Sequence, residues 1–93
     1  MEKVISREKY LEICQLVQSA LAQWYKADAK FFIERLQFLE SEIDPPARNV
    51  YGELVVFTMA AVGQVKDKEF KVDNVDRALY KLERFVEPEE VSV

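Results

Sequence analysis

The feature that most constrains this chain is the apolar run from Leu54 to Val62, in which Thr58 is the one polar residue. The run is too short to cross a bilayer, which takes about 20 apolar residues. We therefore predict an element that is buried on all sides and covered by the other segments. Its length favours a helix over residues 47–65, after the break at Asp44-Pro45-Pro46. Because Val, Phe and Thr also suit a strand, an α+β fold with part of residues 54–62 as a strand is the alternative.

The segments before this run show the spacing of amphipathic helices. We expect a first helix from the N-cap Ser6 to about residue 25, and a second over residues 29–43 with Asp28 as its N-cap. The apolar stripe of the first helix is Tyr10, Ile13, Cys14, Val17, Leu21 and Trp24, and that of the second is Phe32, Leu36, Leu39 and Ile43.

A polar linker over residues 66–73 follows the apolar run, with Phe70 as its expected anchor. The last helix is expected to begin after the N-cap Asp73 and to end before Pro88. Residues 87–93 are expected to form a frayed tail.

A chain of 93 residues with 49% apolar and 32% charged residues is typical of one small globular domain, here residues 1–93. Four helices with short connections place neighbouring helices antiparallel to each other. The sequence therefore predicts an all-α fold, a compact antiparallel four-helix bundle.

The residue inventory argues against chemistry at a metal or a nucleophile. The chain has no histidine and a single cysteine, Cys14, which lies on the apolar stripe of the first helix. Zinc sites of imidazole and thiolate, disulfide frameworks and the usual acyl-transfer triads are excluded within one chain on this basis. We therefore expect no enzymatic activity, no metal and no cofactor.

The net charge of −4 disfavours a general surface for nucleic acid or for anionic membranes, because phosphate binding rests on clustered Lys and Arg. The N-terminus has no apolar stretch of signal-peptide length, so a cytoplasmic location is expected. A basic partner protein fits the charge better than a nucleic acid or a membrane.

Two phenylalanines of the second helix, Phe31 and Phe38, fall about 100° or more away from its apolar stripe. Neighbouring helices that cover the two rings are one explanation. The other is a contact surface for a second chain, since aromatic residues and Arg are enriched in interfaces. Glu34 and Arg35 lie between the rings and belong to the same candidate site, and Tyr80, which points away from the stripe of the last helix, is a further candidate.

Acidic residues gather where helices end. Acids at a helix C-terminus oppose the helix dipole by up to roughly 1 kcal/mol each, which favours a role in binding; solubility is the alternative explanation. In an up-down-up-down bundle, the second and fourth helices end at the same pole. That pole collects Glu40, Glu42, Asp44, Glu87, Glu89 and Glu90, and the opposite pole collects Lys26, Lys30, Lys66, Lys68 and Lys71.

A small, acidic, all-helical chain with an acidic and aromatic second helix resembles the immunity proteins of bacterial toxin systems, of the contact-dependent inhibition and colicin-nuclease kinds. The resemblance extends over the whole length in general character. The Tyr-Tyr-Pro motif of DNase-colicin immunity proteins is absent from this chain. The resemblance implies a protein that binds and blocks a toxin nuclease, which is often basic.

Two functions follow as hypotheses. The first is a non-enzymatic protein-binding inhibitor, an immunity protein that neutralises a basic toxin domain. Its anchors are Phe31, Arg35 and Phe38, and its steering charges are Glu34, Glu40, Glu42 and Asp44. The alternative is a self-associating structural or adaptor module, a homodimer that pairs the same aromatic face. A weaker third hypothesis, a nucleic-acid-associated regulator, requires the lysine-rich pole.

Overall fold

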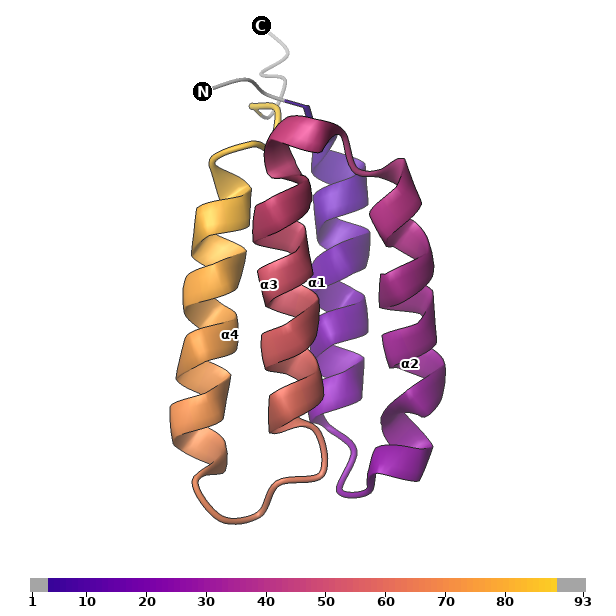
Figure 1. Ribbon diagram of the computed structural model, residues 1–93, viewed down its shortest axis with the longest axis vertical. Coiled ribbons are helices and arrows are strands. Elements are labelled where there is room, and N and C mark those ends of the chain that lie inside the picture. Colours follow the sequence, from indigo (N-terminus) through magenta and orange to yellow (C-terminus); the bar gives the residue numbers. More distant parts are fainter. Residues whose placement is uncertain (1–3, 89–93) are drawn as a thin grey trace, which may run out of the picture.

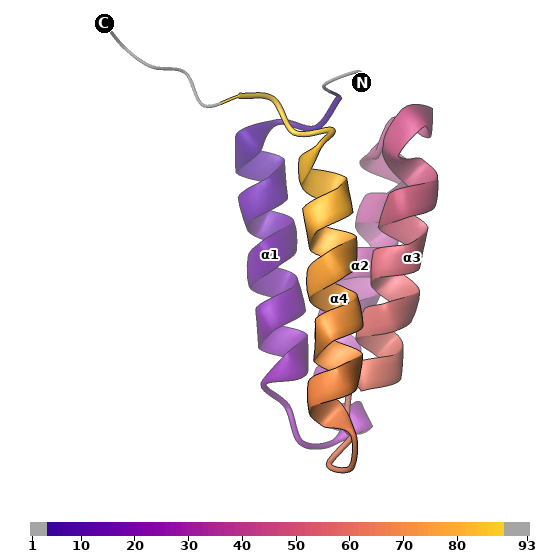
Figure 2. The ribbon, with the colours of Figure 1, turned by 90° about the vertical axis from the view of Figure 1, so that its left-hand side faces the viewer.

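The computed structural model describes residues 4–88, and within that range the chain forms four α-helices and no strand. The elements in chain order are α1 (Arg7–Leu21), α2 (Lys26–Leu39), the short 3₁₀ helix η1 (Glu40–Glu42), α3 (Pro45–Ala61) and α4 (Lys68–Glu83). Successive helices run in opposite directions along an elongated body of 45 × 25 × 23 Å (Figures 1 and 2). The predicted antiparallel four-helix bundle is confirmed. The alternative with a strand inside residues 54–62 is wrong, because this run is helical up to Ala61.

Helix α3 supplies the largest share of the core. It is not buried on all sides, although the sequence predicted that it would be. Its inward face is buried and consists of Ala47, Tyr51, Leu54, Val55, Thr58 and Ala61. On its outward face the side chains of Val56 and Met59 are 61% and 42% exposed. The reason is geometric: a helix of a four-helix bundle turns one side to the core, and the run carries apolar residues around more of the helix than that side covers.

The helices pack as two hairpins. Contacts are most extensive between α3 and α4 and between α1 and α2, and they are sparse between α2 and α3. The contact between α2 and α3 includes a hydrogen bond from the buried Tyr51 hydroxyl to the Leu36 carbonyl. Helices α2 and α4 are not neighbours and lie on opposite sides of the bundle (Figure 1).

The connection between α1 and α2 is longer than the sequence indicated. Helix α1 ends at Leu21 rather than near residue 25, and α2 begins at Lys26 with Tyr25, not Asp28, as its N-cap residue. The Lys68 ammonium group donates a hydrogen bond to the Leu21 carbonyl at 2.8 Å, which satisfies one of the carbonyls left open at the end of α1. Trp24, expected on the apolar stripe, lies in this connection and is 62% exposed.

Helix α4 begins earlier than predicted. Residues 68–73 are helical rather than a linker, and the N-cap position is held by Asp67, whose φ of 61° is left-handed, instead of by Asp73. Phe70, the expected anchor, is 66% exposed. A run of alternating charges has no apolar periodicity of its own, so the start of α4 was not visible in the sequence pattern.

The two ends of the described chain meet beyond α4. Helix α4 ends at Glu83, and Ile5 and Val86 form an isolated parallel bridge. The Ile5 carbonyl accepts a hydrogen bond from the Glu87 N–H at 2.7 Å. The part of the expected tail beyond Pro88 lies outside the described residues.

Candidate functional site

The candidate site is the outward face of α2. This helix packs inward through Ala29, Ile33, Leu36 and Leu39, which are all buried. Since successive residues turn by about 100°, the side chains on the other side of the helix have no neighbouring helix to cover them. The residues exposed there include four that the sequence predicted for partner binding: Phe31, Glu34, Arg35 and Phe38.

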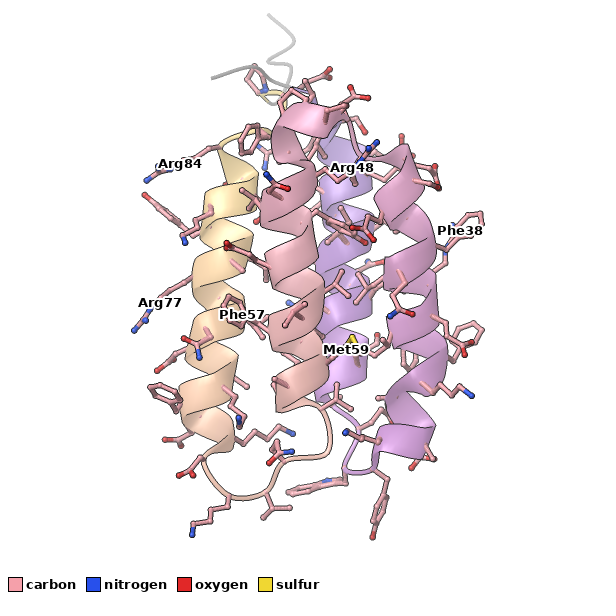
Figure 3. The ribbon with its side chains drawn as sticks, viewed as in Figure 1. Phe38, Arg48, Phe57, Met59, Arg77 and Arg84 are labelled. Carbon is pink, nitrogen blue, oxygen red and sulfur yellow. The ribbon has the colours of Figure 1, made fainter. Side chains whose placement is uncertain are left out.

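The two phenylalanine rings are open to solvent. The side chains of Phe31 and Phe38 are 71% and 62% exposed, and Figure 3 shows Phe38 pointing away from the bundle. The Phe31 ring stands edge-on to the half-buried Phe32 ring, with the centroids 5.5 Å apart. Coverage by neighbouring helices, one of the two explanations open at the sequence level, therefore does not account for these rings.

Arg35 is held in place between the rings. Its guanidinium carbon lies 5.3 Å from the centroid of the Phe38 ring, a cation–π distance. One of its terminal nitrogens lies 3.8 Å from a carboxylate oxygen of Glu12 on α1. Lys30 and Glu34 form a further ion pair at 3.8 Å on the same helix. The side chains that could anchor a partner are thus partly ordered before any partner binds.

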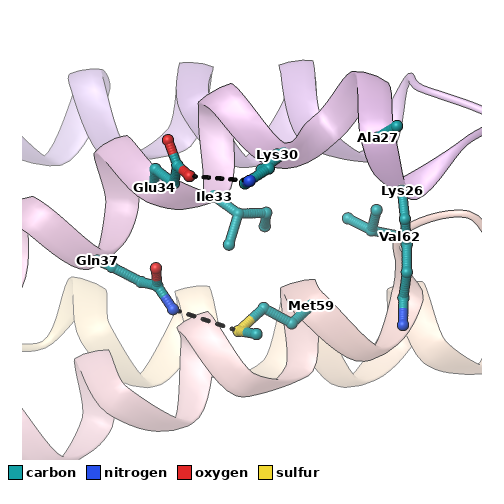
Figure 4. A pocket seen from close by; sticks show the side chains of 8 residues that line it. All are labelled: Lys26, Ala27, Lys30, Ile33, Glu34, Gln37, Met59 and Val62. Carbon is teal, nitrogen blue, oxygen red and sulfur yellow. Dashed lines mark hydrogen bonds and ion pairs between the residues drawn. The ribbon is translucent and has the colours of Figure 1, made fainter.

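A groove runs beside this face, between α2 and α3 (Figure 4). It has a volume of about 420 Å³, with Ile33 and Val62 at its base and Met59 on the α3 side. The Gln37 amide donates to the Met59 sulfur at 3.8 Å across the groove. The sequence did not predict this groove, because Met59 lies inside the apolar run that was expected to be buried on all sides. The sparse packing of α2 on α3 could not be read from either helix alone.

The acidic residues at the end of α2 are partly engaged within the molecule. Glu42 pairs with Lys9 of α1 at 2.9 Å. Glu40 is half-buried, with a carboxylate oxygen 3.8 Å from the point where a Cβ on Gly52 would lie. Asp44 is the N-cap residue of α3, as predicted, although its side chain makes no capping hydrogen bond. The position of Asp44 at the N-terminus of α3 is electrostatically favourable, so it does not oppose the helix dipole as the sequence argument assumed.

The ends of α2 and α4 do lie at the same pole, as the bundle topology predicted (Figure 1). Arg48 lies near the end of α2 and donates two hydrogen bonds to the Ile43 carbonyl, at 3.2 and 3.0 Å. Together with Lys9, it places positive charge among the acids. Glu87 is exposed, whereas Glu89 and Glu90 lie outside the described residues.

Tyr80 does not belong to the α2 face. It lies on α4, is 65% exposed, and has the Arg84 guanidinium carbon 5.6 Å from its ring centroid. Figure 3 shows Arg77 and Arg84 projecting from the flank opposite to Phe38. A single partner surface that includes both Phe38 and Tyr80 would have to wrap around the bundle.

The thiol and the buried phenols favour their neutral forms. Burial raises the pKa of the half-buried Cys14 thiol, which therefore stays protonated and is a poor nucleophile at neutral pH. Burial also raises the pKa of Tyr51, with a smaller contribution from the Glu40 carboxylate. Within residues 4–88, no group of three or more acidic or thiol side chains is arranged to hold a metal ion.

Comparison of the chain with family models, with curated proteins and with solved structures found no match. Among the described residues, no helix combines the length and apolar character needed to cross a membrane.

Proposed function

We propose that this protein is a non-enzymatic inhibitor that binds a partner protein through the outward face of α2. The observation that carries the proposal is the pair of exposed rings, Phe31 and Phe38, on either side of an arginine that is already held by Glu12 and stacked on Phe38. Aromatic residues and Arg dominate the energetics of protein interfaces when they become buried. An arginine that is ordered in advance loses less side-chain entropy on binding.

The groove beside α2 extends this surface. A side chain of the partner could enter between α2 and α3, where Ile33, Met59 and Val62 supply apolar contacts. The methionine can adapt its shape to what enters, because its side chain is unbranched and flexible. Exposed rings with an apolar groove beside them are suited to become the buried centre of an interface, which is typically surrounded by a polar rim.

The partner most consistent with the charge is a basic protein, and the specific form of the proposal is an immunity protein that neutralises a basic toxin domain in the cytoplasm. The net charge of −4 favours the encounter through long-range attraction. Because Glu42 is paired with Lys9 and Glu34 with Lys30, we assign the steering mainly to Glu40 and Asp44, with a smaller part for Glu34 and Glu42.

Binding kinetics against each candidate toxin domain that is encoded next to this chain test the proposal. Phe38→Ala should speed dissociation at least about tenfold, as expected for truncation of an interface anchor. Tyr80→Ala, which truncates an aromatic side chain of similar exposure on α4, away from the α2 face, should leave the dissociation rate unchanged and is the matched control. Equal rates for wild type and Phe38→Ala would contradict the proposed site, and no binding of any neighbouring toxin would contradict the immunity role.

The charges are tested separately by the triple variant Glu40→Gln, Glu42→Gln and Asp44→Asn. It should slow association by a few-fold at low salt and leave dissociation unchanged, with a shallower salt dependence than wild type. Asn keeps the N-cap role at the start of α3, so the helix content in circular dichroism should not change. An association rate equal to that of wild type at both low and high salt would assign these acids to solubility.

Self-association through the same face is the second candidate function. The exposed Val56 and Met59 on α3 favour it, because they add apolar area that a second copy could cover together with the α2 rings. Sedimentation velocity at micromolar concentration distinguishes the two functions. A dimer that Phe38→Ala dissociates supports self-association, whereas a monomer leaves the face to a different partner.

A further inference from the structure

A second exposed apolar surface lies at the end of the bundle opposite to the chain termini. Here the α1–α2 connection, residues 22–25, and the α3–α4 connection, residues 62–67, both turn back into the bundle (Figures 1 and 2). We call these two connections, together with the first turns of α2 and α4, the loop tip. It carries four of the ten large hydrophobic side chains that are exposed in the described part of the chain: Trp24, Tyr25, Val65 and Phe70, between 62% and 73% exposed.

The two connections of the loop tip are tied to one another. Lys68 of α4 donates a hydrogen bond to the Leu21 carbonyl at 2.8 Å, and its ammonium nitrogen lies 5.2 Å from the centroid of the Trp24 ring. Gly63 adopts a φ of 74°, and a Cβ at this position would lie 3.2 Å from the backbone nitrogen of Lys26. The exposed side chains are therefore displayed on a supported surface.

The loop tip is slightly positive although the whole chain is acidic. The lysines there are Lys26, Lys66, Lys68 and Lys71, and the acids are Asp28, Asp67 and Glu69. The loop tip therefore has a net charge of +1 and the rest of the chain one of −5, since the whole chain has a net charge of −4. An anionic surface would be attracted to this end and repelled by the rest of the molecule.

We propose that the loop tip docks on the surface of a bilayer that contains anionic lipids. Trp and Tyr have an apolar ring with a polar group at its edge, and they favour the level of the lipid headgroups. Lysines beside them can lay their aliphatic stems on apolar surface and keep the ammonium group at the phosphates. Trp24 and Tyr25 are followed by Lys26, and Val65 by Lys66, so both connections carry the same pairing of apolar and cationic side chains.

This proposal departs from the expectation drawn from the net charge. Net charge sums the charges at both ends of an elongated molecule. A flat anionic surface interacts with only one end at a time, because charges beyond a Debye length of about 10 Å from the surface are screened. The long axis of 45 Å keeps the acidic pole well outside that distance when the loop tip touches the bilayer. Docking at the tip would also leave the α2 flank open to a protein partner.

Trp24 is the only tryptophan of the chain, so its fluorescence reports directly on the tip. We would titrate the full chain with vesicles of phosphatidylcholine alone and of phosphatidylcholine mixed with phosphatidylglycerol. The expected result is a blue shift of the emission, quenching by brominated acyl chains, and co-sedimentation that is at least about threefold stronger on the anionic vesicles. The three acids of the tip limit this preference.

The double variant Tyr25→Ser and Val65→Ser keeps the reporter and removes apolar side chains from both connections. It should partition about tenfold more weakly, because each side chain gains free energy by leaving water. Serine is a preferred N-cap residue, so the change at Tyr25 should not weaken the start of α2, which circular dichroism verifies.

The matched control is the double variant Phe31→Ser and Phe38→Ser, which removes the same number of exposed apolar side chains from the α2 flank. It should bind vesicles as wild type does and lose the partner protein, whereas the tip variant should do the reverse. The membrane proposal and the proposed inhibitor function therefore fail independently. No emission change and no co-sedimentation on either kind of vesicle, or equal binding by wild type and the tip variant, would overturn the proposal.

Discussion

Helix α3 packs closely against α4 on one side and loosely against α2 on the other. The α4 side offers the fully buried Val75, Ala78 and Leu82, with a small residue between two larger ones. The α2 side leaves a groove of about 420 Å³. The difference shows that one small bundle combines a closely packed pair of helices, which stabilises the fold, with a loosely packed pair, which leaves surface accessible. The α3–α4 contact buries core side chains, while the open α2–α3 contact leaves side chains accessible to another molecule.

The largest expected effect comes from matched truncations on the α4 side and the α2 side of α3, which test this comparison directly. Leu82→Ala removes a side chain that is 0% exposed on α4, and Ile33→Ala removes one of equal size that is 9% exposed at the base of the groove. We expect losses of about 4 kcal/mol for Leu82→Ala and about 2 kcal/mol for Ile33→Ala, since a site open to a groove can collapse or admit water more readily than a closed one. Urea denaturation measures both free energies of unfolding. Equal losses would show that the groove base is as closed as the α3–α4 contact.

The two glycines of the chain lie toward opposite ends of the α2–α3 contact and give the next largest effect. Gly63→Ala forces a side chain into a left-handed φ of 74° and places its Cβ 3.2 Å from the Lys26 backbone nitrogen. We expect a loss of about 1–2 kcal/mol in thermal unfolding.

Gly52→Ala is the control for this prediction. Its Cβ would meet only a Glu40 carboxylate oxygen at 3.8 Å, an ordinary contact. Alanine is a better helix residue than glycine, so this variant should gain about 0.5–1 kcal/mol of stability. If Gly63→Ala were also stabilising, the described support of the loop tip would be incorrect.

The smallest effect concerns the hydrogen bond that Tyr51 makes across the open contact. Tyr51→Phe removes the bond to the Leu36 carbonyl and should cost about 1 kcal/mol near neutral pH. The pKa of Tyr51 is raised in the folded state, so the native structure favours the neutral phenol. The corresponding stability is fully present below the unfolded pKa of about 10 and falls as the pH rises above it.

Denaturation at a series of pH values tests this assignment. Wild type should lose stability above about pH 10, and Tyr51→Phe should lose less. Tyr10, whose pKa burial also raises, leaves a residual loss in the variant. Identical pH profiles for the two proteins would assign the alkaline transition to Tyr10 alone.

The sequence by itself determined the number of helices, their alternating directions and the outward position of the α2 rings. These properties follow from the 3.6-residue period of one helix at a time, which tells which side of that helix is apolar. Phe31 and Phe38 lie off the stripe of α2, and the helix is exposed where they lie. The placement of helix ends was less accurate, since the start of α4 at Lys68 has no apolar periodicity to mark it.

Only the tertiary structure decided how closely the helices approach and which side chains meet. The groove beside Met59, the pairing of Glu42 with Lys9 and the separation of Tyr80 from the α2 face all depend on contacts between distant segments. The loop tip likewise joins two connections that lie far apart in the sequence, with Lys68 bound to the Leu21 carbonyl. Periodicity orients each helix about its own axis, but the distance between two axes is set by the volumes of the side chains from both helices, which no single stretch of sequence contains.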